Sequence, residues 1–193
     1  MSAPKLFVCL FLGISLIACG SDDGNDTTSQ TTTSSETGVT TTVPATNPYA
    51  PYDGSCPTFV EGENTAFQSA GLNRTVQIRL PVEPVGAPVV FGWHWLGGNA
   101  NQTISTLGLD GMANEGAIVV APESSGLQYE WDYMSVSDSV DATLFDDLLW
   151  CLWEQYQVDD QRIYATGMSA GGLMTTFLII ARSEQLAAAL PFS

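Results

Sequence analysis

Basic residues are scarce in this sequence of 193 residues, which has five lysines and arginines against 21 aspartates and glutamates. The formal net charge is −16, and no lysine follows Lys5. A surface of this charge offers no electrostatic footprint for nucleic acid or for anionic lipid headgroups. The composition therefore argues against a nucleic-acid partner, and we interpret the acidity as a contribution to solubility.

Histidine and cysteine are also rare, since the chain has one histidine, His94, and four cysteines. Their positions show no metal-ligand spacing, so the sequence predicts no metal site. Cys9 and Cys19 belong to the N-terminal segment described next, which leaves Cys56 and Cys151. These two pair with each other, or each pairs with a cysteine outside this sequence; both alternatives fit an oxidising compartment.

The first 18 residues have the pattern of a signal peptide. Lys5 precedes an apolar stretch, residues 6–18, that is too short to span a membrane stably. Small residues before Cys19 and the polar residues after it resemble a bacterial lipobox, which implies cleavage before Cys19 and its acylation. The alternative is an ordinary signal peptide with an incidental cysteine.

The residue after Cys19 is Gly20 and not aspartate, which by resemblance to enterobacterial sorting rules favours the outer membrane. We therefore expect a lipid-anchored protein of the bacterial cell envelope, or a secreted one. Residues 19–50 are rich in threonine and serine and have few large apolar side chains, which predicts a solvated tether. Residues 51–193 are then the folded part, of a length that suits part of one domain.

Apolar runs alternate with helical patterns along this folded part. The expected strands are residues 74–82, 88–93, 117–121, 162–166 and 186–193, and the expected helices are residues 103–114, 137–157 and 173–182. This alternation predicts an α/β fold with a mostly parallel sheet covered by helices on both faces. Active sites of such sheets lie beyond the carboxyl ends of the strands.

Residues 167–172 read Gly-Met-Ser-Ala-Gly-Gly between the strand at 162–166 and the helix at 173–182. A G-x-S-x-G pattern in this context is typical of a nucleophile elbow, so we expect Ser169 to be a catalytic nucleophile. Side chains at Gly167 or Gly171 would collide with the neighbouring strand and helix. The Ala170 N–H begins the helix and is the expected first oxyanion donor. The alternative is a chance match to a loose pattern.

His94 follows the buried strand at 88–93 and opens a loop that contains Gly97 and Gly98. An α/β-hydrolase keeps its second oxyanion donor in this place, and we assign it to the Leu96 N–H. We expect the His94 ring to bond to backbone groups and to hold the loop rigid. The alternative is that His94 is the general base.

Three tryptophans, Trp93, Trp95 and Trp131, fall near these loops. Their rings are candidates for stacking on a sugar or an aryl acyl group, and the alternative is ordinary core packing. Trp150 and Trp153 belong to the helical pattern at 137–157 and are expected in the core.

Residues 158–172 resemble the elbow of secreted poly(3-hydroxybutyrate) depolymerases and feruloyl or acetylxylan esterases, which carry V-D-x-x-R-I/V-Y-x-T-G-x-S-x-G-G. The family also has an Asp pair on a helix, here Asp146 and Asp147. The resemblance implies an α/β-hydrolase fold, serine ester hydrolysis, no cofactor and Ser169 as the nucleophile. Trp95 stands where the family usually has glycine, so the loop of the second oxyanion donor departs from the family pattern here.

Neither histidine nor aspartate occurs after Ser169, although the triad of this fold follows the order Ser, Asp/Glu, His. We therefore expect this chain to be the N-terminal part of a larger enzyme, inactive alone and lacking the C-terminal strands. Its expected partner is an ester substrate: a plant-wall polysaccharide ester, a polyester or a small aryl ester. The alternatives are a serine peptidase of the same fold and a non-catalytic surface-binding lipoprotein.

The lipobox interpretation predicts that Cys19→Ala releases the protein from the membrane fraction, because no acyl chains can be attached to alanine. The measurement is sedimentation of membranes followed by immunodetection. A variant that still sediments like the parent would show that an uncleaved apolar segment holds the protein instead.

Overall fold

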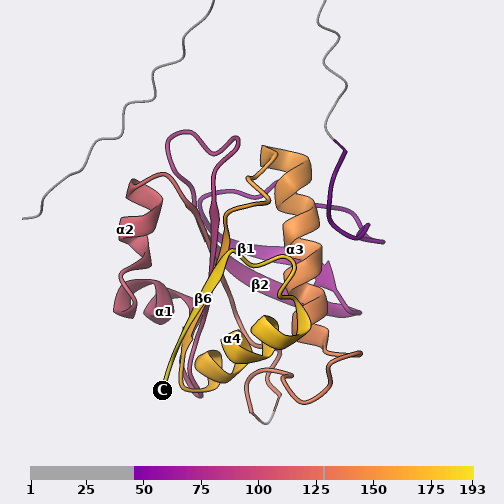
Figure 1. Ribbon diagram of the computed structural model, residues 1–193, viewed down its shortest axis with the longest axis vertical. Coiled ribbons are helices and arrows are strands. Elements are labelled where there is room, and N and C mark those ends of the chain that lie inside the picture. Colours follow the sequence, from indigo (N-terminus) through magenta and orange to yellow (C-terminus); the bar gives the residue numbers. More distant parts are fainter. Residues whose placement is uncertain (1–45, 128) are drawn as a thin grey trace, which may run out of the picture. The chain divides into compact units, whose positions relative to one another are not determined.

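The computed structural model describes residues 46–127 and 129–193 (Figure 1). The expectations for the signal peptide and for Cys19 lie outside these residues. Within the described part of the chain, no helix combines the length and the apolar character needed to cross a membrane.

Six strands form one mixed sheet in the described residues, in the order β1-β2-β4-β3-β5-β6 (Figure 1). The strands are β1 (Gly62–Ser69), β2 (Leu72–Arg79), β3 (Val89–Trp93), β4 (Ile118–Pro122), β5 (Ile163–Met168) and β6 (Ala188–Phe192). β2 runs antiparallel to both of its neighbours, whereas β4, β3, β5 and β6 are mutually parallel. The expected mostly parallel sheet is confirmed.

Helices cover both faces of this sheet because the central strands are apolar on both sides. The helices are α1 (Ala100–Thr106), α2 (Leu109–Asn114), α3 (Val140–Tyr156) and α4 (Ala170–Ala181). On β3, Phe91 and Trp93 pack in a core with side chains of α3 and α4, whereas Val90 packs with α1 and α2. This alternation is the period-2 pattern of a strand, and here both of its faces are buried.

The structure differs from the expectations at two places. β1 was not expected, because its sequence GENTAFQS is largely polar and buries only Phe67 and Ser69 at the edge of the sheet. The single helix expected at residues 103–114 is divided in two, since Gly108 adopts a left-handed conformation with φ 67° between α1 and α2. The long helix α3 is capped by Ser139, whose side chain accepts the Ala142 N–H.

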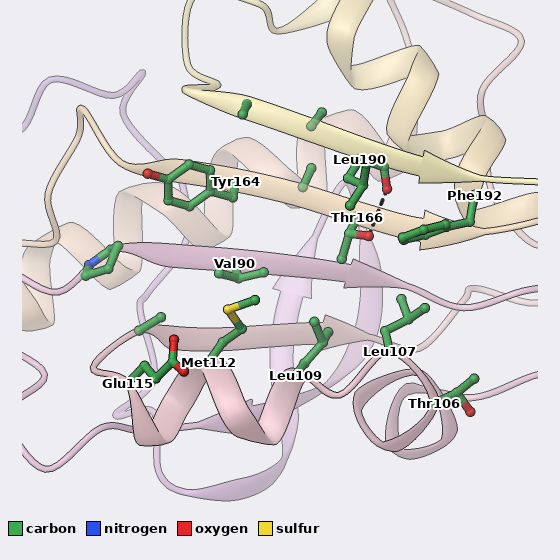
Figure 2. Close-up of a pocket in the computed structure, with 15 residues that line it drawn as sticks. Val90, Thr106, Leu107, Leu109, Met112, Glu115, Tyr164, Thr166, Leu190 and Phe192 are labelled. Atoms are coloured by element: carbon green, nitrogen blue, oxygen red, sulfur yellow. Dashed lines mark hydrogen bonds between the residues drawn. The ribbon is translucent and has the colours of Figure 1, made fainter. Parts of the chain in front are cut away.

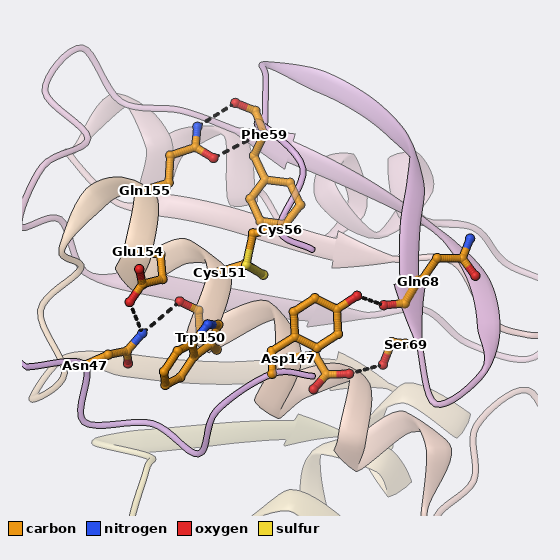
Figure 3. Close-up of a disulfide and its surroundings, with 11 residues drawn as sticks. Asn47, Cys56, Phe59, Gln68, Ser69, Asp147, Trp150, Cys151, Glu154 and Gln155 are labelled. Carbon is orange, nitrogen blue, oxygen red and sulfur yellow. Dashed lines mark hydrogen bonds between the residues drawn. A yellow bond between two sulfur atoms is a disulfide. The ribbon is translucent and has the colours of Figure 1, made fainter. Parts of the chain in front are cut away.

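Cys56 and Cys151 form a disulfide with a Cα–Cα distance of 5.3 Å, so the first of the two alternatives holds (Figure 3). The bridge fastens the segment before β1 to the middle of α3. Hydrogen bonds reinforce this attachment, because Asn47 donates to the Glu154 carboxylate at 2.9 Å and Gln155 donates to the Phe59 carbonyl at 3.0 Å. Asn47 therefore belongs to the folded part, although the expected tether extended to residue 50.

The Asp pair expected on this helix has two structural partners. Asp146 binds Arg182 at the end of α4 through both carboxylate oxygens, at 2.8 and 2.9 Å. Asp147 accepts the Ser69 hydroxyl of β1 at 2.6 Å, and burial raises the pKa of its carboxyl despite this bond (Figure 3). Asp146 thus links α3 to α4, and Asp147 links α3 to the edge strand β1.

An apolar groove of about 840 Å³ lies on the face of the sheet that α1 and α2 cover (Figure 2). Figure 2 shows Leu190 and Phe192 of β6 on one wall and Leu107 and Leu109 on the opposite wall. Leu190 is 59% exposed and Phe192 is 43% exposed. The sheet therefore presents an exposed apolar edge at β6.

We expect the double variant Cys56→Ser/Cys151→Ser to lose about 2–4 kcal/mol of unfolding free energy, because the bridge closes a long loop. Urea denaturation followed by tryptophan fluorescence measures this loss. The parent protein in reducing agent is the control and should unfold at the same urea concentration as the variant. Coincident curves for the oxidised parent and the variant would show that the bridge does not stabilise the fold.

Candidate active site

The expected site residues lie at one edge of the sheet, where β3, β4 and β5 end. Ser169 follows β5, His94 follows β3, and the loop at residues 123–139 follows β4. The loops after β3 and β4 are bonded to each other, since the Ser124 N–H donates to His94 Nε2 at 3.1 Å. This is the edge at which parallel α/β sheets place their active sites.

Ser169 occupies the sharp turn between β5 and α4 with φ 54° and ψ −116°. A positive φ is rare for a residue other than glycine and is typical of strained functional positions. The turn is held by the Ser169 N–H, which donates to the Phe192 carbonyl, and by the Leu173 N–H, which donates to the Ser169 carbonyl, both at 2.9 Å. The Ser169 side chain is exposed, and it makes no hydrogen bond within the described residues.

The glycines around Ser169 permit three close backbone approaches. A Cβ at Gly171 would lie 1.9 Å from the Trp93 carbonyl oxygen, and a Cβ at Gly167 would lie 2.4 Å from the Gly171 carbonyl oxygen. The collisions expected at these two positions are confirmed. Gly172 is a third such position that the sequence reasoning did not single out, because its Cβ would lie 2.3 Å from the Phe192 carbonyl oxygen.

The N–H groups of Ala170 and Leu96 are the two expected oxyanion donors. Neither donates a hydrogen bond to another of the described residues; Leu96 is exposed, whereas Ala170 is 8% exposed. The N–H groups of the two loop glycines are already hydrogen-bonded. Gly97 donates to Glu130 Oε1 at 2.7 Å, and Gly98 donates to the Trp95 carbonyl at 2.8 Å. The assignment of Leu96 stays a prediction.

The His94 ring is buried and both of its nitrogens are bonded to backbone groups. Nε2 accepts the Ser124 N–H at 3.1 Å, which requires that Nδ1 carries the proton and donates to the Trp95 carbonyl at 2.9 Å. These are the backbone bonds that the structural interpretation of His94 expects. The lone pair that a general base would use is occupied in this arrangement.

Glu130 and Ser124 complete the loop contacts, and the sequence reasoning did not identify them. Glu130 accepts the Gly97 N–H on one oxygen and the Ser124 hydroxyl on the other, at 2.7 and 2.6 Å. Burial raises the pKa of the Glu130 carboxyl, but these two hydrogen bonds contribute to holding it below its usual range. No local pattern marks either residue, since Gly97 and Glu130 are 33 positions apart.

Two of the three tryptophans are core residues. Trp93 and Trp131 are 0% and 1% exposed, with ring centroids 4.9 Å apart in an edge-to-face arrangement. The Trp131 indole Nε1–H donates to the His94 carbonyl at 2.8 Å. Stacking of a substrate on these two rings is therefore excluded, and the core-packing alternative is confirmed for them, whereas Trp95 is partly exposed.

A shallow cavity of about 440 Å³ adjoins the elbow. Its lining comes from the first turns of α4 and the end of β6: Ser169, Gly172, Leu173, Thr176, Pro191, Phe192 and Ser193.

Among residues 46–127 and 129–193, no three histidine, cysteine or acidic side chains are grouped so that they could hold a metal ion.

Known proteins resemble this chain in both sequence and fold. Residues 104–191 match the prolyl oligopeptidase family. A probable feruloyl esterase C of Aspergillus terreus is 33% identical over 106 residues, which are 52% of this chain and 37% of that protein. Feruloyl esterase C of Emericella nidulans is 30% identical over 146 residues, which are 72% of this chain and 51% of that protein.

Solved structures share the fold at lower identity. The native crystal structure of sOPH has a TM-score of 0.62 at 21% identity, covering 74% of this chain and 53% of that one. Acetyl xylan esterase from Aspergillus awamori has a TM-score of 0.55 at 22% identity, covering 66% and 49%. At these identities the likeness shows the α/β-hydrolase fold alone.

The chain spans about half the length of these relatives or less, with 37% of one feruloyl esterase and 51% of the other. The matched regions include the elbow, since residues 104–191 contain Ser169 and its glycines. The shared fold shows that this chain has the α/β-hydrolase architecture, and its sequence is similar to those of feruloyl esterases.

Proposed function

We propose that this chain is the N-terminal part of a serine carboxylic ester hydrolase in which Ser169 is the nucleophile. The observation that carries the proposal is the strained turn at Ser169, which presents an exposed hydroxyl directly before the free N–H of Ala170. The feruloyl esterases among the sequence relatives support ester hydrolysis. Plant-wall polysaccharide esters, polyesters and small aryl esters are the substrate classes that fit.

In the proposed reaction, Ser169 Oγ attacks the ester carbonyl carbon while its proton passes to a histidine. The carbonyl oxygen becomes an oxyanion that accepts the Ala170 and Leu96 N–H groups, an effect worth about 2.7–4 kcal/mol per donor. Collapse of this intermediate breaks the ester bond, and the histidine returns the proton to the leaving alcohol. Water then hydrolyses the acyl-serine by the same steps.

The histidine in this proposal is not His94, because backbone groups occupy both of its ring nitrogens. His94 is the one histidine of the sequence, so the general base comes from a part of the protein outside it. The open apolar groove beside β6 supports the proposal, since its exposed Leu190 and Phe192 offer a surface on which further elements can pack.

A serine peptidase of the same fold is the second candidate, favoured by the match of residues 104–191 to the prolyl oligopeptidase family. Both reactions use the same nucleophile and oxyanion donors, so the elbow does not separate them. The two activities are distinguished by comparing turnover of a p-nitrophenyl ester with turnover of a peptidyl p-nitroanilide. Relative to the uncatalysed reactions, an esterase accelerates cleavage of the ester much more.

For localisation, we propose that acylated Cys19 anchors the enzyme in the cell envelope, with the Thr/Ser-rich residues before Asn47 as a tether. The lipobox resemblance supports this proposal. The Cys56–Cys151 disulfide fits it as well, because such bridges persist in oxidising compartments.

We expect residues 19–193 alone to show no Ser169-dependent turnover of a p-nitrophenyl ester, because no free imidazole is present to accept the Ser169 proton. The measurement compares the purified chain with its Ser169→Ala variant. Turnover that disappears in the variant would contradict the proposal of an external histidine and make His94 the base.

In the full-length protein that contains this chain, Ser169→Ala should lower turnover on the order of 10⁵–10⁶-fold and abolish labelling by a fluorophosphonate. His94→Ala should lower turnover roughly 10- to 1,000-fold, because it disturbs the loop and not proton transfer. Kinetics and gel fluorescence of the labelled protein give both results. Equal losses in the two variants, with neither labelled, would mean that His94 works directly with Ser169.

A further inference from the structure

Three hydrogen bonds join the loop after β4 to the loop after β3. The Ser124 N–H donates to the His94 ring at 3.1 Å, and the Trp131 indole Nε1–H donates to the His94 carbonyl at 2.8 Å. The Glu130 carboxylate provides the third by accepting the Gly97 N–H, and within its own loop it also accepts the Ser124 hydroxyl. Glu130 is therefore the side chain that joins the glycine turn of one loop to the start of the other.

Both bonds to Glu130 are charge-assisted and short, at 2.7 Å from the Gly97 N–H and 2.6 Å from the Ser124 hydroxyl. Glu130 itself adopts a φ of 67°, and its N–H donates to the Leu127 carbonyl at 3.0 Å. A residue other than glycine stays in this conformation only where its surroundings hold it there. The local structure thus keeps the carboxylate facing Gly97.

The turn that Glu130 holds also contains the Leu96 N–H. Gly98 donates to the Trp95 carbonyl and closes the turn, while Gly97 has a φ of 74° that few other residues adopt. Gly97 and Leu96 contribute successive peptide planes, so fixing the Gly97 N–H restricts the direction of the Leu96 N–H. The start of this loop lies against the elbow, because a Cβ at Gly171 would lie 2.8 Å from the His94 carbonyl oxygen.

We propose that Glu130 is a positioning residue for the second oxyanion donor: it holds the Gly97 N–H and thereby orients the neighbouring Leu96 N–H toward the reacting carbonyl of an ester bound at Ser169. This role rests on the proposed function. It also removes Gly97 from the set of possible donors, because its N–H is already used.

A negative carboxylate near a developing oxyanion opposes it electrostatically, so the contribution of Glu130 must be geometric and not one of charge. A glutamine at position 130 distinguishes the geometric contribution from the contribution of charge. Its carbonyl oxygen can accept the Gly97 N–H and its amide can donate to Ser124 Oγ, so Glu130→Gln keeps both contacts and removes the charge. Glu130→Ala removes both contacts.

In the full-length protein, we expect Glu130→Ala to lower kcat about 10- to 100-fold with KM changed less than about 2-fold, since a misplaced donor weakens only the transition state. Glu130→Gln should restore kcat to within about 3-fold of the parent. The matched control is Glu184→Ala, which removes an exposed carboxylate elsewhere in the fold and should leave kcat unchanged.

Hydrogen exchange of a peptide covering residues 94–99 is the second measurement, because it does not depend on turnover. Glu130→Ala should speed exchange of the Gly97 amide at least about 10-fold, whereas Glu130→Gln and Glu184→Ala should not. Unchanged exchange, unchanged kcat in Glu130→Ala, or an equal fall of kcat in Glu130→Gln would each overturn the proposal.

The two proposals fail in different ways. If the parent shows no Ser169-dependent turnover, the proposed function fails, and the exchange result alone decides whether Glu130 holds the turn. If Ser169-dependent turnover is present and Glu130→Ala leaves kcat unchanged, the proposed function stands and the role of Glu130 falls.

Discussion

The site depends on one close approach of two backbones, where the first turn of α4 crosses the end of β3. At Gly171 there is no room for a side chain, because a Cβ would lie 1.9 Å from the Trp93 carbonyl oxygen. This approach places the helix N-terminus beside the loop that begins at His94, so that the Ala170 and Leu96 N–H groups belong to adjoining segments. The strain at Ser169 follows, since the chain must turn sharply to enter the helix.

A buried ion pair fixes the far end of the loop that supports this arrangement. Arg74 of β2 binds Asp141 of α3 at 2.6 Å, and the two side chains are 1% and 0% exposed. The second oxygen of Asp141 accepts the Asp132 N–H at 2.7 Å, next to Trp131, which is bonded to the His94 carbonyl. Removing one member of such a pair typically costs about 3–5 kcal/mol, because it leaves an uncompensated buried charge.

Sequence reasoning succeeded where the cause is local. The glycines of the elbow form a short pattern, and β3, β4 and β5 are continuous apolar runs, so both are recognisable within a few positions, and the structure has them in the expected places. β1 was missed because an edge strand with a polar sequence lacks the apolar signal. Glu130 was missed because its partner Gly97 is 33 positions away, and one glutamate in an acidic chain carries no distinguishing pattern.

The chemistry of the His94 position explains why a histidine stands there without acting as a base. The Ser124 N–H requires an acceptor, and the Trp95 carbonyl on the other side of the ring requires a donor. A neutral imidazole supplies one of each on a rigid ring without a charge, whereas lysine and arginine offer no acceptor. Burial against Trp131, with ring centroids 4.6 Å apart, adds a packing requirement that a small amide would not meet. His94 therefore binds the loop after β4 through Nε2 and its own loop through Nδ1, and proton transfer from Ser169 is left to another group.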